Sequence, residues 1–373
     1  MKLEISLVGY GLTPFGEWWD KSLQDLMREA IDATLQTTKI PVEDVDIVIV
    51  ANMIGEVTSD QAHLGAMAAG MLPHNPAAMR VESACGSGAF ALHTACAFLE
   101  SGRAQTVLVV GAEKMTDVSV DTVSDALMGA ADAEIDAPSG LTFPGIFGLI
   151  ANRYMYEYGL TRDELSVVSA VHHKHAVKNQ FAQFRQEITP EAVSTSAAVS
   201  DPLRLLDCSP ITDGAAACIL STKHRSGQRI AASQIATDSL SITERPTITS
   251  FSATKKAMAK ALHEAQIERS AIKSLEVHDC FSIAGVINVE DLGFARPGEG
   301  AKLYQELYAG AAPVMVNPSG GLKACGHPIA ATGIKQLIDS SKYLKQTRGR
   351  YALTHNFGGA GTSCGIHILE NTI

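Results

Sequence analysis

Hydrophobic and polar positions follow each other in blocks that predict strands and helices in turn. Residues 3–9 and 46–52 are short, rich in β-branched residues and almost uniformly apolar, which is typical of strands buried on both faces. Between them, apolar side chains recur at the spacing of one helix face: Leu23, Leu26, Met27, Ala30 and Ile31. A helix over about 85–100 and a strand over 106–111 follow. This alternation predicts a parallel sheet with helices on both faces.

The pattern changes after Met115 and returns near residue 215. Residues 118–200 have few strand-like runs, and we interpret them as an insertion into the first α/β unit. A second series then predicts helices over 253–265 and 287–292, a long helix after Pro328, and strands over 215–220, 274–278, 350–355 and 364–369. The sequence ACGS before one helix, at 84–87, is echoed by ACGH before another, at 324–327. The echo fits two related halves.

Composition narrows the class of protein. The chain has 373 residues, of which 46% are hydrophobic and 19% charged, and this indicates two or three globular domains. A net charge of −10 argues against broad binding to nucleic acid or an anionic membrane. Seven cysteines without a CxxC pair or a Cys/His cluster favour neither a disulfide scaffold nor a metal site. Without a signal-peptide pattern or a membrane-length apolar run, we expect a soluble, cytoplasmic protein with no membrane span.

Cys85 is the first candidate for chemistry. It lies in the sequence VESACGSGA, at a predicted strand-to-helix turn flanked by small residues that leave room for a substrate. The start of a helix presents free N–H groups and a partial positive charge, so we expect the thiol pKa to be lowered. The alternative is a buried structural cysteine.

His327 is the second candidate. The stretch NPSGGLKACGHP, residues 317–328, places it directly before a helix-starting proline. Histidine is the usual base for a thiol near neutral pH, so Cys85 and His327 form a candidate nucleophile–base pair. Taken alone, His327 would only cap a helix.

Two further motifs end predicted strands. In EVHDCF, residues 276–281, His278 and Cys280 are two apart and share a face if the segment is extended. In HNFGGAG, residues 355–361, a strand leads into a glycine loop whose N–H groups can hold an oxyanion. Each motif alone also fits ordinary packing or a common glycine turn.

Together, the Cys85 turn, the 317–328 stretch and the late glycine loop resemble those of thiolases. The motif HDCF at 278–281 and the segment SPITDGAAA at 209–217 resemble the branch of sterol-carrier-protein thiolases and archaeal acetoacetyl-CoA thiolases. This implies an α/β thiolase fold, with two similar βαβαβ halves in a five-layered αβαβα arrangement. The halves would be residues 1–117 with 201–224 and residues 225–373, and the inserted loop domain over the CoA site would be residues 118–200.

The resemblance also implies roles for single residues. Cys85 would become acylated, His327 would activate it and direct a donor at the thioester oxygen, and His278 would hold a catalytic water. The backbone N–H groups of Cys85 and Gly358 would form the oxyanion hole. Asn356 stands where most relatives carry a second cysteine, so Cys280 is implied to supply the acid/base thiol from another loop.

The implied activity is the condensation of two acetyl-CoA molecules to acetoacetyl-CoA, or the cleavage of a 3-ketoacyl-CoA by CoA. Acyl-CoA and CoA would be substrates, with no permanently bound cofactor. The implied assembly is a homodimer or a dimer of dimers, and some relatives work with a small acyl-CoA-binding partner subunit. We interpret the basic stretch at 172–178 as a solvated helix face rather than a CoA phosphate contact.

Two alternatives stay open. The set of Cys85, His278 and His327 also resembles that of decarboxylating ketoacyl synthases, and an acyltransferase with a non-CoA acceptor is related to these. A need for malonyl-thioester as extender would distinguish a synthase from a thiolase. The second alternative is a non-catalytic subunit that binds acyl-CoA or lipid, and such a subunit would gain no acetyl group on Cys85.

Overall fold

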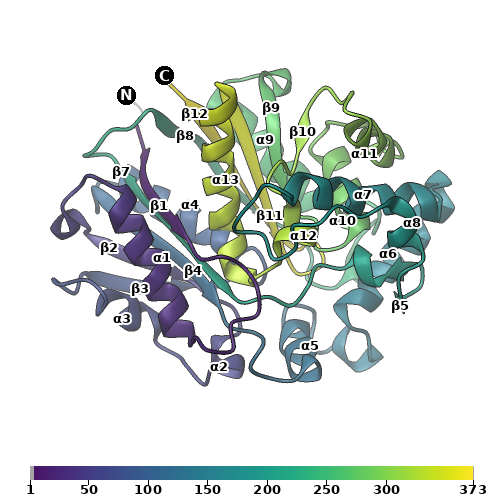
Figure 1. The fold of residues 1–373 in the computed structure, drawn as a ribbon, viewed down its shortest axis with the longest axis horizontal. Helices are drawn as coiled ribbons and strands as arrows, with labels where there is room; N and C mark the ends of the chain where they lie inside the picture. Colours follow the sequence, from purple (N-terminus) through teal and green to yellow (C-terminus); the bar gives the residue numbers. More distant parts are fainter. Residues whose placement is uncertain (1–3, 373) are drawn as a thin grey trace.

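The computed structural model describes residues 4–372, whose main sheet has ten strands in the order β10-β9-β11-β12-β8-β1-β7-β4-β2-β3 (Figure 1). The N-terminal half contains β1 (Ser6–Leu12), β2 (Ile47–Ala51), β3 (Ala77–Val81), β4 (Thr106–Glu113) and β7 (Gly214–Ser221). The C-terminal half contains β8 (Gln228–Thr237), β9 (Ile272–Val277), β10 (Met315–Val316), β11 (Tyr351–Gly358) and β12 (Ser363–Asn371). The halves join through the pairing of Ser6 in β1 with Arg229 in β8.

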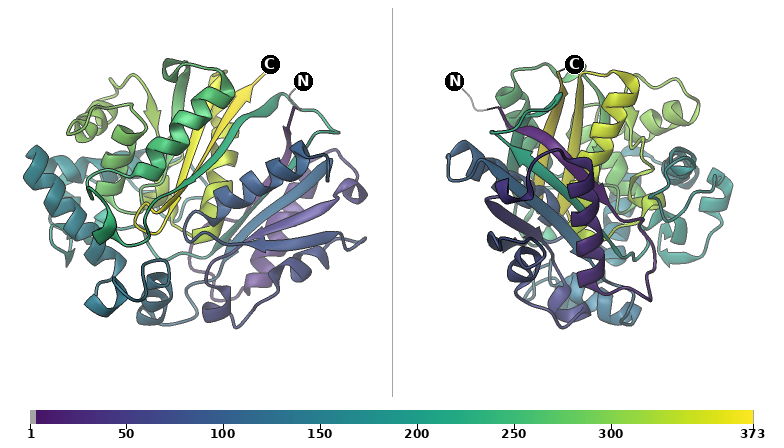
Figure 2. Two further views of the ribbon diagram at one scale, coloured as in Figure 1. Left: turned by 180° about the vertical axis from the view of Figure 1, so that it is seen from behind. Right: turned by 60° about the vertical axis from the view of Figure 1, so that its left-hand side comes forward.

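The two halves share one topology. In the first, β1 is antiparallel to β7 and β7 to β4, while β4, β2 and β3 are parallel neighbours. In the second, β8, β12, β11, β9 and β10 repeat this order and these directions. Figure 2 shows the purple-to-blue half and the green-to-yellow half as two sheets that meet along β1 and β8. The prediction of two related α/β halves is confirmed.

Helices complete five layers. The central pair, α4 (Ser87–Glu100) and α13 (Thr332–Thr347), lies between the two sheets and contacts strands of both halves. The outer face of the N-terminal half is covered by α1 (Leu23–Thr37) and α3 (Leu64–Ala69). The outer face of the C-terminal half is covered by α9 (Ser252–Ala265) and α10 (Ser282–Asp291).

Glycines let the two central helices meet backbone to backbone. A Cβ built on Gly88 in α4 would lie 2.6 Å from the carbonyl oxygen of Ala330, and one built on Gly333 in α13 would lie 2.5 Å from the nitrogen of Ala89. Any larger side chain at these positions would push the helices apart. This contact places the N-terminal ends of α4 and α13, and the loops that precede them, next to each other.

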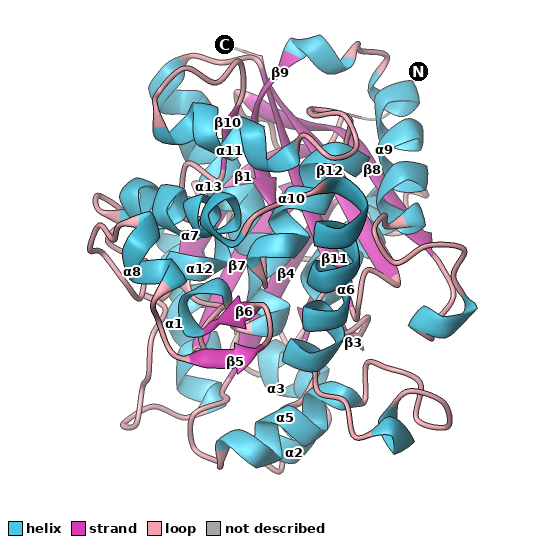
Figure 3. Cartoon of the chain, turned by 90° about the vertical axis from the view of Figure 1, so that its right-hand side faces the viewer, coloured by secondary structure: helices cyan, strands magenta, loops and turns pink. Residues whose placement is uncertain are grey.

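The insertion lies between β4 and β7 and faces the viewer in Figure 3. It contains α5 (Val120–Met128), α6 (Phe143–Tyr158), α7 (Arg162–Ala176), α8 (Pro190–Ser194) and the short strands β5 (Ala198–Ser200) and β6 (Leu203–Arg204). Buried Asp213 ties its two ends together, because its carboxylate binds the Lys114 ammonium at 2.8 Å and accepts the N–H groups of Met115 and Thr116. The insertion is therefore anchored to the sheet at the point where it leaves it.

Some elements differ from the sequence prediction. The helix predicted from Cys85 begins at Ser87, so Cys85 stays in the preceding turn. The strand predicted over 3–9 is β1, and residue 3 lies outside the described residues. Strands β3 and β8 were missed because their side chains are exposed or only half-buried at many positions. The short elements α2 (Gly55–Thr58), α11 (Gly300–Tyr308), α12 (Gly321–Cys325) and β10 were missed as well.

Within residues 4–372, no helix has both the length and the apolar character that crossing a membrane requires.

Candidate active site

A cavity of about 180 Å³ lies where the ends of both halves meet the insertion. Three of the predicted site residues line it: Cys85, Cys280 and His327. The insertion and the HDCF motif supply an apolar wall that includes Leu127, Phe143, Phe147 and Phe281. Cys85 and Cys280, which come from different halves, therefore line one cavity of mainly apolar character.

The turn that carries Cys85 is tightly hydrogen bonded. Ala84 has a positive φ of 50°, a conformation that costs on the order of 1 kcal/mol outside glycine. The N–H of Gly86 donates to the Ser83 carbonyl oxygen at 2.9 Å, and the N–H of Ser87 donates to the Ala84 carbonyl oxygen at 3.1 Å. The N–H groups of Gly86 and Ser87 are thus occupied within the turn.

The pKa of Cys85 moves in the direction opposite to the prediction. Burial raises the pKa of its thiol to about 12, and the carboxylates of Glu113 and Glu82 raise it further. The N–H groups of Gly359 and of Cys85 itself oppose this shift without overcoming it. The N–H groups of Gly86, Ser87 and Ala89 at the helix start bind other acceptors and do not lower this pKa. Cys85 therefore rests as a thiol and needs a base to become a nucleophile.

His327 has the correct tautomer to be that base. Its Nδ1 lies 2.7 Å from the hydroxyl oxygen of Thr332, and this hydroxyl donates to the Pro328 carbonyl oxygen at 3.1 Å. The hydroxyl therefore accepts from Nδ1–H, which leaves the lone pair on Nε2. Nε2 has no hydrogen-bond partner among the residues described. Burial lowers the pKa of His327 to about 3, so the ring is neutral at pH 7.

His278 has the opposite tautomer, and Asn356 sets it. The Asn356 Oδ1 accepts the N–H of Ala89 at 3.3 Å, so the other amide atom is the nitrogen, a donor. This Nδ2 donates to the Cys85 carbonyl oxygen at 3.0 Å and to the Nδ1 of His278 at 2.9 Å. The His278 proton consequently lies on Nε2, which is buried without a partner within residues 4–372.

The two imidazoles meet edge to face. The ring centroids of His278 and His327 are 4.9 Å apart at an interplanar angle of 86°. Burial lowers the pKa of His278 well below its ordinary value, and the neighbouring His327 adds to this effect. The site thus combines two neutral imidazoles: the N–H donor of His278, from the loop after β9, and the base of His327, from the loop before α13. Asn356 is buried and does not line the cavity, so the structure gives it a positioning role.

The N–H that reaches the Cys85 sulfur belongs to Gly359 rather than to Gly358. Gly359 lines the cavity and has a φ of 62°, whereas Gly358 is the last residue of β11, where it pairs with Ser363. The structure therefore favours Gly359, with Cys85, as the pair of backbone donors around the nucleophile. The prediction of Gly358 as an oxyanion donor stays a prediction, because the contact of Gly359 is to the sulfur.

Cys280 is held from both sides in the loop after β9. Its carbonyl oxygen accepts the N–H of Ser209 at 2.8 Å, and Cys208 pairs with Phe281. Burial raises the pKa of the Cys280 thiol well above its ordinary value, and the Cys85 and Asp279 charges raise it further. This second thiol is close enough to Cys85 for the two charges to interact.

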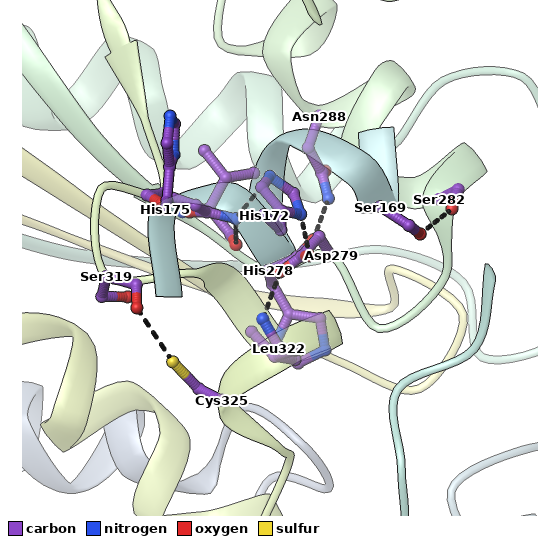
Figure 4. Close-up of polar contacts among 12 residues, drawn as sticks. Ser169, His172, His175, His278, Asp279, Ser282, Asn288, Ser319, Leu322 and Cys325 are labelled. Carbon is purple, nitrogen blue, oxygen red and sulfur yellow. Dashed lines mark hydrogen bonds and ion pairs between the residues drawn. The ribbon is translucent and has the colours of Figure 1, made fainter. Parts of the chain in front are cut away.

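The prediction missed two acidic groups and a histidine near the site. Glu113 at the end of β4 accepts the N–H of Met53 at 2.5 Å, and burial raises its pKa to about 8. Asp279 pairs with His172 of α7, with Nδ1 and Oδ2 2.7 Å apart, and accepts the N–H of Leu322 at 2.8 Å (Figure 4). These contacts tie the insertion and α12 to the HDCF motif.

The interpretation of residues 172–178 as a solvated face is therefore wrong for two of them, because His172 and His173 are buried. A signal for His172 was present in the sequence, since it continues the apolar helical spacing of Leu165 and Val168.

Comparisons with known proteins agree with this geometry. The family model described as thiolase, N-terminal domain, matches residues 5–224, and that described as thiolase C-terminal domain-like matches residues 235–371. The acetyl-CoA acetyltransferase of Methanocaldococcus jannaschii is 41% identical over 392 residues, covering 99% of both proteins. Sterol carrier protein 2 of Bos taurus is 30% identical, covering 97% of this chain and 71% of that protein.

Two solved structures share the fold. Human mitochondrial 3-ketoacyl-CoA thiolase in complex with CoA has a TM-score of 0.80 at 20% identity, with both chains fully covered. The Ltp2–ChsH2(DUF35) aldolase has a TM-score of 0.85 at 21% identity, covering 100% of this chain and 98% of that one. From the matched domains and the full-length relatives, the chain belongs to the thiolase family.

Proposed function

We propose that this protein is a CoA-dependent thiolase that condenses two acetyl-CoA molecules to acetoacetyl-CoA, or cleaves 3-ketoacyl-CoA with CoA, through an acyl group on Cys85. The observation that carries this proposal is the cavity lined by the Cys85 and Cys280 sulfurs together with His327. The full-length relative with 41% identity is named as an acetyl-CoA acetyltransferase, which supports the same reaction.

The first half-reaction uses the base that the structure prepares. The Nε2 lone pair of His327 takes the Cys85 proton as the sulfur attacks the thioester carbonyl carbon. Negative charge then develops on the carbonyl oxygen, and the N–H groups of Cys85 and Gly359 are positioned to stabilise it. A single such donor commonly contributes about 100- to 1000-fold to a rate. CoA leaves with the proton, and Cys85 keeps the acyl group.

The second half-reaction needs a separate base at the α-carbon of the next acetyl-CoA. The Cys280 sulfur faces the same cavity and takes this proton. The enolate oxygen is stabilised by the His278 Nε2–H, directly or through a water. The new carbon–carbon bond forms at the acyl carbon, and the bond to the Cys85 sulfur breaks. A decarboxylating synthase generates its nucleophile by losing CO₂ and needs no second thiol, so Cys280 favours the thiolase.

Mass spectrometry and one variant test this assignment. Wild-type protein mixed with acetyl-CoA should gain one acetyl group on Cys85, and Cys280→Ala should gain it equally well. The same variant should lose condensation and thiolysis by about 100-fold or more, because a general base commonly contributes about 100- to 10,000-fold. Normal condensation by Cys280→Ala would reject the second thiol as the base, and no acetyl group on wild-type Cys85 would reject the thiolase.

The substrate arm and the assembly belong to the same proposal. Residues 118–200 would form the domain over the CoA site, since Leu127, Phe143 and Phe147 already line one wall of the cavity.

A homodimer is supported by β3, which is an edge strand of the sheet and exposes Met79. A small partner subunit is supported by the Ltp2–ChsH2(DUF35) aldolase, which shares the fold and whose name joins two proteins. Light scattering of the purified chain tests the dimer.

A further inference from the structure

Lys323 is a buried lysine beside the proposed site that the mechanism above does not use. It lies in α12, between the glycine turn and His327, and only 2% of it is exposed. Its Nζ has no hydrogen-bond partner within the described part of the chain. Lysine is almost never fully buried unless it is paired, because an uncompensated ammonium is costly away from water. Some feature of the site must therefore account for this charge.

The ammonium lies behind the aromatic wall of the cavity. Its Nζ is 5.7 Å from the ring centroid of Phe281, which in turn stacks on Phe147 with centroids 4.5 Å apart. Both rings line the cavity, whereas Lys323 does not. A substrate in the cavity would meet the rings, so Lys323 can act on the reaction only through another residue.

Four ionisable side chains act on the Lys323 ammonium: Asp279, Cys208, Cys280 and Asp207. Neither carboxylate hydrogen bonds the ammonium, although Asp279 is the largest of these charges. Asp207 binds the guanidinium of Arg162 at 2.8 Å, and Asp279 lies 2.7 Å from His172. Both carboxylates thus have nearer partners than Lys323.

The two thiols differ in what they already bind. The Cys208 sulfur donates to the Arg204 carbonyl oxygen at 3.4 Å. The Cys280 sulfur faces the cavity, and its anionic form is favoured by Lys323 and by the N–H of Phe281. The other charges that act on Cys280, those of Cys85 and Asp279, are negative and disfavour its anion. Lys323 also lowers the pKa of His278 and His327, which helps to keep both rings neutral.

We propose that Lys323 is a positioning residue that stabilises the negative charge on the Cys280 sulfur, so that Cys280 can remove the α-proton of the second acyl-CoA. The inference rests on the proposed function and names the group that makes its second base effective. Burial holds the pKa of the Cys280 thiol well above its ordinary value, and the Lys323 ammonium in the same low-dielectric environment opposes this shift without overcoming it.

The protons of the condensation step balance between Cys280 and Cys85. The Cys280 thiolate takes a proton from the α-carbon, and the C–H bond breaks. The resulting enolate attacks the acyl carbon, which forms the C–C bond and breaks the bond to the Cys85 sulfur. The Cys85 thiolate released in this way takes the proton from Cys280. Cys280 thus enters and leaves this step as a thiolate, the form that burial disfavours and that the Lys323 ammonium favours.

The test compares Lys323→Met and Lys323→Gln, which remove the charge, with Lys323→Arg, which keeps it. Acetylation of Cys85 by acetyl-CoA, read by mass spectrometry, reports folding and the first half-reaction. Condensation of acetyl-CoA reports the second. Alkylation of the Cys280 peptide by iodoacetamide across pH, in chains that also carry Cys85→Ser, reports the ionisation of Cys280 directly.

We expect the Met and Gln variants to acetylate Cys85 within about threefold of wild type and to lose condensation by about 100-fold or more. Their alkylation midpoint at Cys280 should rise by about one pH unit or more, while the Arg variant stays close to wild type. An unchanged midpoint or unchanged condensation in the neutral variants would overturn the proposal. Loss of Cys85 acetylation in all three variants would also overturn it, by assigning Lys323 a structural role.

These outcomes separate the inference from the proposed function. If wild-type Cys85 gains no acetyl group, the thiolase proposal fails, while the alkylation midpoint still shows whether Lys323 governs Cys280.

Discussion

Replacing Thr332 by valine should slow acylation of Cys85 without dismantling the site. Valine matches threonine in shape, so the change removes one hydroxyl from a buried position. The Pro328 carbonyl oxygen still accepts a hydrogen bond in the variant, because the backbone N–H of residue 332 also donates to it, at 3.2 Å. The group left without a partner is therefore the Nδ1–H of His327, which the hydroxyl bound at 2.7 Å.

A buried donor without its partner costs about 1–3 kcal/mol. Here the cost falls on the reactive form of His327, which must keep its proton on Nδ1 to offer Nε2 to Cys85. In Thr332→Val the ring is free to move the proton to Nε2 or to rotate, so the reactive form becomes less populated. The same energy corresponds to a rate loss of about 5- to 150-fold.

Rapid mixing with acetyl-CoA, followed by quenching and mass spectrometry of the Cys85 peptide, measures this rate. Thr332→Ser is the matched control, because it keeps the hydroxyl and should acylate within about threefold of wild type. A valine variant that acylates as fast as the serine variant would show that Thr332 does not fix the tautomer, and the assignment of His327 Nε2 as the base would lose its structural support.

Two further predictions concern Asn356 and pH. Asn356→Asp replaces a donor by an acceptor, so the His278 proton should move to Nδ1. Condensation should then fall by about 10-fold or more while Cys85 acetylation persists. Equal loss of both steps would contradict this role of Asn356. Burial lowers the pKa of three histidines to about 3: His327, His355 and His367. The unfolded chain binds protons at these rings below about pH 6.5 and the folded chain does not, so the free energy of unfolding should fall as pH drops from about 6.5 toward 3. Glu113 and Glu276, each with a pKa of about 8 against an ordinary 4.5, act the other way, since the folded chain keeps protons that the unfolded chain loses between these values. The three histidines outweigh the two carboxyls below about pH 6.5, and the carboxyls dominate above it. Urea unfolding at pH 5, 6.5 and 8 should therefore show a maximum at the middle value, and a steady rise from 5 to 8 would contradict the role of the two carboxyls.

Much of the fold and the site was available from the sequence because the signals are local. Buried strands such as β2 and β4 are continuous apolar runs and were predicted to within two residues of their ends, and the helical period of α1 was recognised over its first nine residues. The cysteines and histidines of the site follow strands or precede helices within short motifs. The echo of ACGS and ACGH marked equivalent positions in the two halves, each before the central helix of its half.

Strands β3 and β8 escaped prediction for a physical reason. β3 is an edge strand, β8 lies inside the sheet, and both are half-buried or exposed at many positions, which removes the uniform apolar pattern by which a buried strand is recognised. His172 escaped because only the packing of α7 on the HDCF loop places Asp279 against it.

Charge and proton position were decided only by the tertiary structure. The pKa of Cys85 depends on burial and on Glu113, which is 28 residues away in the sequence, and not on the helix that follows it. The tautomers of His278 and His327 depend on donors and acceptors from other segments, Asn356 and Thr332. A sequence states which ionisable groups exist, but their protonation follows from desolvation and from hydrogen-bond partners, and both are fixed only when distant segments pack together.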